Sequence, residues 1–240
     1  MIEVLAALAE QHAELDALVA GYDEARWASP SRCEGWTVSD VVLHLWHSDQ
    51  LALASVRGEL APAMPSHPGE VDELAGARID ADRGQRSGAE VHVAWRTTAE
   101  TLRRELAACD PSARLQWVAG DLAARTLATT RLAECWIHTN DIEDTEPTDR
   151  LVHVARLAHR TLPYAFSREG RSLSGAVRFE LTAPSSAAWV FGDDDAPTVI
   201  SGDGVELVRV ASRRVPPSAT SLRGTGPDAD AVLELVRTWA

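Results

Sequence analysis

The spacing of apolar residues changes once along this 240-residue chain, near Gly170, and that change limits the folds open to it. Up to that point apolar side chains recur every three or four residues over long runs, as on one face of an α-helix. Beyond it, short runs alternate or are apolar throughout, and clusters of Gly, Pro and Asp separate them. The sequence therefore predicts an α+β protein, with a helical bundle over residues 1–170 and a smaller α+β domain over residues 171–240.

The first part contains several helical runs, which together are typical of an up-down four-helix bundle. The second run begins at Thr37 with Asp40 three residues later, which resembles a capping box. Residues 61–70 hold three prolines and are expected to form a mobile connection. We expect helices over residues 2–22, 37–60, 72–108 (interrupted near 84–88), 121–144 and 148–167.

The second part contains four short runs that we expect to form a small antiparallel sheet. A terminal helix should follow Pro227, because the sequence ADAVLELVRTW returns to helical spacing. The four expected strands are Ala176–Thr182, Ala187–Phe191, Thr198–Ser201 and Val205–Ala211.

Composition narrows the possible partners and compartment. A net charge of −13 disfavours nucleic acids and anionic membrane surfaces, which select for basic patches. The chain has no lysine, which excludes Schiff-base lysine chemistry and a Walker-type phosphate lysine. Its three cysteines are widely spaced, odd in number and without a C-x-x-C pair, as in a reducing cytoplasm. The acidic N-terminal stretch resembles neither a signal peptide nor a membrane span, so we expect a soluble cytoplasmic protein.

The expected helix over residues 121–144 carries the strongest chemical signal. Glu134 and His138 stand four residues apart, on the same helical face, and Asp141 follows on nearly the same line. A carboxylate and an imidazole suit zinc or a similar divalent ion. His44 from the second helix would complete a set of two histidines and one carboxylate, which leaves an open position for water or substrate.

Spacing alone leaves plainer interpretations open. The line formed by Arg131, Glu134, His138 and Asp141 could be a salt-bridged stripe on the protein surface. Cys33 could be a nucleophile, although nothing in its sequence surroundings lowers its pKa, which favours an inert thiol. For His47, and for the histidines that have no partner at a suitable spacing, a structural or surface role is favoured. Those other histidines are at positions 12, 67, 92, 153 and 159.

Two motifs together resemble the mycothiol-dependent maleylpyruvate isomerase family, a branch of the DinB-like metal-binding bundles. The first is RWASPSRCEGWTVSDVVLHL, in which a Pro-x-x-Cys-x-Gly-Trp-Thr turn precedes a helix with His44 eight residues after Trp36. The second is Glu-x-x-x-His-x-x-Asp, matched by Glu134, His138 and Asp141. The resemblance implies a divalent metal, usually zinc, held by His44, Glu134 and His138. Asp141 would then orient a ligand imidazole.

The C-terminal sequence is similar to the small α+β domain of the same family, but more weakly. That domain has a strand ending in Gly-Arg, with Ser212 at the glycine position here. By position Arg213 would be the functional arginine, steadying a carboxylate or enolate, although the adjacent Arg214 leaves the register open.

The resemblance implies an enzyme that uses a metal-bound low-molecular-weight thiol, mycothiol. It would either isomerise a small electrophilic substrate bearing a carboxylate or transfer the thiol sulfur onto it. A metal-bound thiol is held as its thiolate, which can add to an electrophile. Fold does not fix reaction, so two alternatives stay open. One is a thiol-independent biosynthetic enzyme on the same scaffold, and the other is a non-catalytic metal- or ligand-binding protein.

Overall fold

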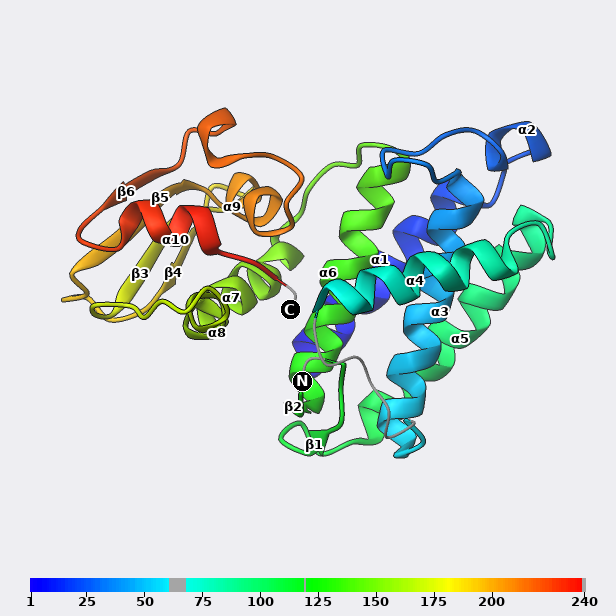
Figure 1. Cartoon of the computed structure of the whole chain (residues 1–240), viewed down its shortest axis with the longest axis horizontal. Coiled ribbons are helices and arrows are strands. Elements are labelled where there is room, and N and C mark those ends of the chain that lie inside the picture. Colours follow the sequence, from blue (N-terminus) through cyan, green and yellow to red (C-terminus); the bar gives the residue numbers. More distant parts are fainter. Residues whose placement is uncertain (61–67, 119, 239–240) are drawn as a thin grey trace. The chain divides into compact units, whose positions relative to one another are not determined.

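The structure, a computed structural model, describes residues 1–60, 68–118 and 120–238. It divides into two compact units, Met1–Thr145 and Glu146–Ala240, each of which is drawn in Figure 1. The predicted combination of a helical N-terminal domain with a smaller α+β part is confirmed. Residues 61–67 of the expected mobile connection lie outside the described residues, and residues 68–70 belong to a helix.

Four long helices build the first unit, together with shorter elements. The chain's first strands form a two-stranded antiparallel hairpin before the last long helix. The predicted break near residues 84–88 separates the helix Pro68–Asp82 from the helix Gly88–Ala108. The elements are α1 (Ile2–Val19), α2 (Glu24–Trp27), α3 (Val38–Arg57), α4 (Pro68–Asp82), α5 (Gly88–Ala108), β1 (Arg114–Leu115), β2 (Leu122–Ala123) and α6 (Ala124–Ile142).

Local sequence determines where the bundle helices begin. The Thr37 side chain accepts a hydrogen bond from the Asp40 amide and the Asp40 carboxylate accepts one from the Thr37 amide, so the expected capping box starts α3. Ser87 and Glu90 form a second capping box at the start of α5. Gly58 ends α3 in the left-handed conformation, with φ of 69°.

The directions of the helices refine the expected up-down arrangement. Trp46 on α3 donates to Thr98 on α5, and farther along both helices Arg57 pairs with Glu105, so α3 and α5 run parallel. This is possible because the chain returns between them through α4, which crosses α3 (Figure 1). Helix α1 is antiparallel to α5, since His12 faces Arg103 and Asp16 faces His92, and it is parallel to α6, as the contacts of Gln11 with Thr139 and Glu14 with Thr145 show. The long helices therefore run up, down, down and up.

Helix α6 has no solvated face. Fourteen of its nineteen residues are buried, and they include polar and charged side chains. Apolar residues lie on every side of a helix only when other structure surrounds it. The polar groups of α6 are therefore held in the interior, which decides the character of the site described below.

The second unit holds a four-stranded sheet in the order β4-β3-β5-β6. The expected antiparallel sheet is only partly correct, because β3 and β5 pair in parallel, Val177 opposite Thr198, whereas the other neighbours are antiparallel. Short helices accompany the strands. The elements are η1 (Asp149–Leu151), α7 (Val152–Arg160), α8 (Leu162–Arg168), β3 (Val177–Thr182), β4 (Ala188–Phe191), β5 (Thr198–Asp203), α9 (Gly204–Ala211), η2 (Pro217–Ala219), β6 (Arg223–Thr225) and α10 (Ala229–Leu235).

The strand expected over residues 205–211 is wrong, because this segment forms helix α9. Asp203 caps the helix by accepting hydrogen bonds from the amides of Val205 and Glu206. Buried and partly exposed positions then follow helical spacing, despite the valines that favoured a strand. The fourth strand is instead β6, a three-residue edge strand paired with β5.

The domain boundary also differs from the one expected at residue 170. Helices α7 and α8 pack against elements of the second unit, α7 on β4 and α9, and α8 on α10. The division therefore falls between residues 145 and 146. The single helix expected over residues 148–167 is three elements, with Thr161 between α7 and α8.

None of the helices in the described residues combines the length and the apolar character needed to span a membrane.

Candidate metal centre

The structure brings together the three side chains that the sequence proposes as metal ligands. His44 projects from α3, and Glu134 and His138 project from α6. The Glu134 Oε2 atom lies 3.5 Å from His44 Nε2 and 3.8 Å from His138 Nε2. The two imidazole rings are 4.7 Å apart between centroids. One ligand atom from each residue lies within 4.8 Å of the others, a spacing that fits a single ion.

The protonation states of His44 and Glu134 also suit a metal. Burial lowers the pKa of His44, and the Glu134 carboxylate opposes this only in part, so the imidazole stays neutral. Burial alone would raise the pKa of Glu134, but the interaction with His44 and the positive charge of Arg131 lower it to about 2. A neutral imidazole and an ionised carboxylate are the forms that bind a divalent ion.

The other nitrogen of His138 faces Asp141, one turn along α6. His138 Nδ1 and Asp141 Oδ2 are 3.0 Å apart, and Asp141 is 3% exposed. An Nδ1–H bond to this carboxylate leaves the Nε2 lone pair directed at Glu134 and His44. The geometry agrees with the orienting role proposed for Asp141.

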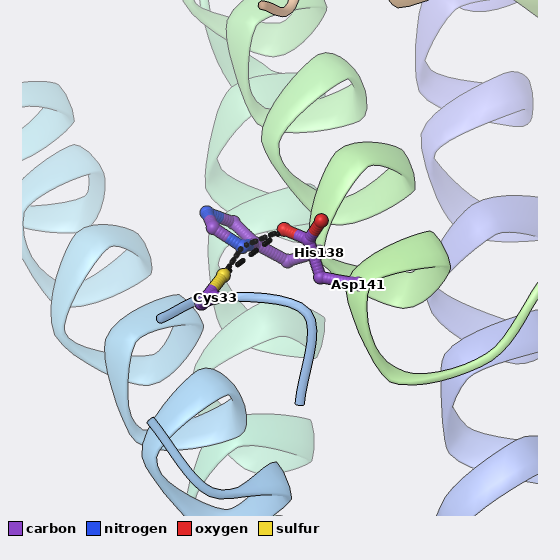
Figure 2. A group of neighbouring side chains, drawn as sticks. All are labelled: Cys33, His138 and Asp141. Atoms are coloured by element: carbon purple, nitrogen blue, oxygen red, sulfur yellow. Dashed lines mark hydrogen bonds and ion pairs between the residues drawn. The ribbon is translucent and has the colours of Figure 1, made fainter. Parts of the chain in front are cut away.

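Cys33 forms a second cluster with His138 and Asp141, at the Nδ1 atom of the His138 ring. Its thiol donates to Asp141 Oδ2 at 3.2 Å, and its Sγ atom is 3.8 Å from His138 Nδ1. Figure 2 shows the thiol pointing from its loop toward the two side chains of α6. Sequence reasoning favoured an inert thiol and missed this contact, because it depends on how the loop folds back onto α6.

The loop that delivers Cys33 is fastened to the C-terminal end of α6. Pro30 and Thr37 close the loop by a β-bridge. The Arg32 amide donates to the Asp141 carbonyl oxygen at 2.8 Å, and the Arg32 guanidinium binds both carboxylate oxygens of Asp144 at 2.6 and 2.7 Å. Together, these contacts explain why the Pro-x-x-Cys-x-Gly-Trp sequence lies beside the second motif.

Trp36, at the end of the same loop, packs on His44. Their rings are 5.3 Å apart between centroids. Residues of the loop also line a pocket of about 240 Å³, and Cys33 and Trp36 contribute to its wall. One short segment therefore contacts both histidines of the trio, one through Trp36 and one through Cys33.

The histidines given structural roles from their spacing have other partners. His47 turns away from the trio toward α4, where its Nε2 atom lies 2.9 Å from Asp82. His92 lies 2.6 Å from Asp16, and His159 lies 2.8 Å from the carbonyl oxygen of Val177. His67 lies outside the described residues.

The alternative of a surface stripe on α6 is wrong. Arg131, His138 and Asp141 are 5%, 9% and 3% exposed, and Glu134 is only partly exposed. A sequence signal for this burial was present, since Leu127, Leu132 and Trp136 place apolar side chains around the helix.

Arg213 lies in the second unit, directly after α9, with a backbone φ of 61°. Its Nη1 atom donates to the Glu234 carbonyl oxygen at 2.8 Å. Arg213 and Arg214 are both exposed. Burial of part of the side chain lowers the pKa of Arg213, and Arg237 adds to that shift. The catalytic role assigned to Arg213 by resemblance stays a prediction.

Comparison with known proteins finds relatives over almost the whole chain. Residues 8–143 match the family described as the mycothiol maleylpyruvate isomerase N-terminal domain. An uncharacterized protein of Mycobacterium tuberculosis strain CDC 1551 is 31% identical over 239 residues, covering 95% of this chain and 91% of the relative. An uncharacterized protein of strain H37Rv matches to the same extent.

Solved structures show the same fold. The crystal structure of the mycothiol-dependent maleylpyruvate isomerase aligns with a TM-score of 0.62 and 19% identity, over 95% of each chain. The crystal structure of a mutant of the mycothiol-dependent maleylpyruvate isomerase aligns with a TM-score of 0.59 and 20% identity, over 89% of each chain.

Proposed function

Because the chain belongs to the mycothiol maleylpyruvate isomerase N-terminal domain family, we propose that it is a divalent-metal-dependent enzyme that uses a low-molecular-weight thiol. Mycothiol is the proposed cosubstrate, zinc the proposed metal and the cytoplasm the proposed compartment. The substrate is a small electrophile bearing a carboxylate, which the enzyme isomerises or joins to the thiol. The observation that supports this best is the meeting of His44, Glu134 and His138, from two distant segments, in a single buried trio.

The donor set fits such a metal. Two imidazole nitrogens and one carboxylate are the ligands of many catalytic zinc sites, and three protein ligands leave a position open. We propose His44, Glu134 and His138 as the ligands. When bound, the ion would hold a coordinated thiol as its thiolate at neutral pH.

The chain's own residues would prepare the site in defined ways. Asp141 would hold the Nδ1 proton of His138, so that the other ring nitrogen stays available. Glu134 would remain ionised, because its pKa lies at about 2. Trp36 packs against His44 with its ring tilted by 46° and would help to hold that imidazole in place. Arg213 is the proposed partner of a carboxylate or enolate on the substrate.

Metal analysis of the purified protein tests the ligand assignment. His44→Ala and His138→Ala should each lose the metal that the wild type retains after mild dialysis, because two remaining ligands bind a divalent ion weakly. His47→Gln is the matched control, since His47 lies on the same helix as His44 but pairs with Asp82. Full metal content and turnover in both alanine variants would show that the assignment is wrong.

Turnover of maleylpyruvate, measured with and without mycothiol, tests the reaction. Metal-loaded protein should act only when the thiol is present, and a chelator should abolish the activity. Activity with metal but without thiol would identify a thiol-independent enzyme. Bound metal with no activity toward several thiol and electrophile pairs would instead identify a binding protein.

A further inference from the structure

Cys33, His138 and Asp141 direct three metal-binding atoms at one point. The Asp141 Oδ2 atom lies 3.2 Å from Cys33 Sγ and 3.0 Å from His138 Nδ1, and the sulfur lies 3.8 Å from that nitrogen. The thiol and the imidazole therefore both turn toward the same carboxylate oxygen, as Figure 2 shows. A thiol, an imidazole and a carboxylate are each ligands of zinc in proteins, and these three atoms lie within 4.8 Å of one another.

The spacing of the three atoms matches the shell of ligands around a small cation. Ligand atoms about 2.0–2.3 Å from a tetrahedral zinc ion lie about 3.3–3.6 Å from one another. The separations in this cluster run from 3.0 to 3.8 Å and bracket that range. Small side-chain rotations would therefore admit an ion, which would replace the protons that the thiol and the imidazole direct at Asp141.

The charges in the cluster favour a cation over other occupants. The carboxylate of Asp141 disfavours a second negative charge on the neighbouring thiol. A divalent cation removes this conflict, because it stabilises both charges together and deprotonates a thiol that coordinates it. Asp141 and His138 are 3% and 9% exposed, so the attraction between an ion and its ligands would be little screened by water.

The loop that carries Cys33 is already held against α6. The Arg32 amide donates to the Asp141 carbonyl oxygen, and the Arg32 guanidinium binds both carboxylate oxygens of Asp144. Within the loop, the Cys33 amide donates to Ser31 Oγ at 3.1 Å. The sulfur therefore stays beside the two ligands of α6, and binding an ion would order little further chain. Cys33 also lines the pocket of about 240 Å³, which gives an ion a route to the sulfur.

We propose that Cys33, His138 and Asp141 form a second cation site, which takes zinc or a more thiophilic ion. Sulfur and imidazole ligands select such ions over magnesium, calcium and manganese. His138 serves both sites, since its Nε2 atom faces Glu134 of the trio and its Nδ1 atom faces Asp141. While an ion occupies the trio alone, Asp141 keeps the Nδ1 proton. An ion in the second site releases that proton and the thiol proton to solvent, and the imidazolate then bridges the two ions.

Cobalt titration of the purified full chain tests the second site, because Co²⁺ can take the place of zinc and its absorption reports its ligands. Sulfur bound to Co²⁺ gives an intense near-ultraviolet charge-transfer band, whereas the nitrogen and oxygen ligands of the trio give no such band. The protein is first freed of metal and kept reduced with a phosphine, which introduces no competing thiol. The wild type should develop the band and bind a second Co²⁺ ion in equilibrium dialysis.

Substitutions separate the two sites. Cys33→Ser keeps a hydrogen-bonding group of similar size, and it should lose the band and the second ion but keep the ion of the trio. His44→Ala should keep the band, because it removes a ligand of the trio alone. Cys109→Ser is the matched control and should behave like the wild type. Cys109 is likewise partly buried, but its thiol donates to the carbonyl oxygen of Glu105.

The outcomes are distinct. Absence of the band from the wild type at saturating Co²⁺ would overturn the proposal, and so would a band of equal strength in Cys33→Ser or a band lost in Cys109→Ser. Far-ultraviolet circular dichroism checks the fold of each variant, and Cys33→Ala carries the test if the serine variant does not fold. A band that requires Cys33, in a chain whose trio binds no metal, would support the second site and refute the metal-dependent function proposed above.

Discussion

Asp49 should make the stability of this protein depend on pH in a direction opposite to that of most acidic residues. It lies on α3 and is 3% exposed. Burial raises its pKa from 3.8 to about 7, against the opposing charge of Arg131. The folded state therefore holds the Asp49 proton more tightly than the unfolded state does. The fold therefore loses stability as pH rises from 3.8 to about 7; the loss is absent below 3.8 and complete above about 7.

Replacing Asp49 by Asn removes this penalty. A shift from 3.8 to about 7 corresponds to about 4 kcal/mol when the group is fully ionised, at about 1.4 kcal/mol per pH unit. Near pH 5 only about 1–2 kcal/mol of this applies. The advantage of Asp49→Asn over wild type should therefore be about 2–3 kcal/mol larger at pH 8 than at pH 5.

Urea denaturation of both proteins at pH 5 and pH 8, in chelator, measures the difference. His12 also titrates, since burial lowers its pKa to about 3 and the fold loses stability as pH falls below 6.5. That effect is common to wild type and variant and cancels in the comparison. Asp121→Asn, at an exposed site, controls for the chemical change. An advantage of equal size at both pH values would refute the reasoning.

Three further substitutions test the site and the bundle. Asp141→Asn should weaken metal affinity about 10- to 100-fold, measured by competition with a chelating dye, because the ligand imidazole loses its orienting carboxylate; unchanged affinity would contradict this role. Cys33→Ala should change thiol-dependent turnover by less than about tenfold, since one hydrogen bond is lost, whereas complete loss would make the thiol a reacting group. Gly88→Ala should lower the free energy of unfolding by about 1–3 kcal/mol, because its Cβ atom would meet the Trp27 ring; the new atom would lie 2.2 Å from ring atoms. Gly76→Ala, with open space around it, should show no such loss in the same urea titration.

Local patterns predicted those features that depend on a few neighbouring residues. The start of α3 follows from Thr37 and Asp40, which satisfy each other's amides. Glu134 and His138 share a face because helical geometry alone requires it. Helix α9 could also have been predicted, since Asp203 with Glu206 three residues later is a helix-start signal that the valines outweighed.

Other features depend on tertiary contacts, which spacing does not encode. The position of Cys33 follows from the pairing of Arg32 with Asp144, more than a hundred residues away. The burial of Arg131 follows from the packing of α6 on all sides. The parallel course of α3 and α5 follows from the return of the chain through α4. In each case the deciding partner is distant in the sequence.

The proposed metal trio on α3 and α6 has a consequence for the folding and the degradation of the protein. His44 and Glu134 are ninety positions apart, so an unfolded chain offers no preformed trio to an ion. An ion that binds only the folded chain raises stability in proportion to the logarithm of its concentration. Metal supply would therefore regulate how long the protein survives proteolysis as well as how fast it works. If the proposed metal binds there, starvation for it would lower the stability of the protein as well as its activity.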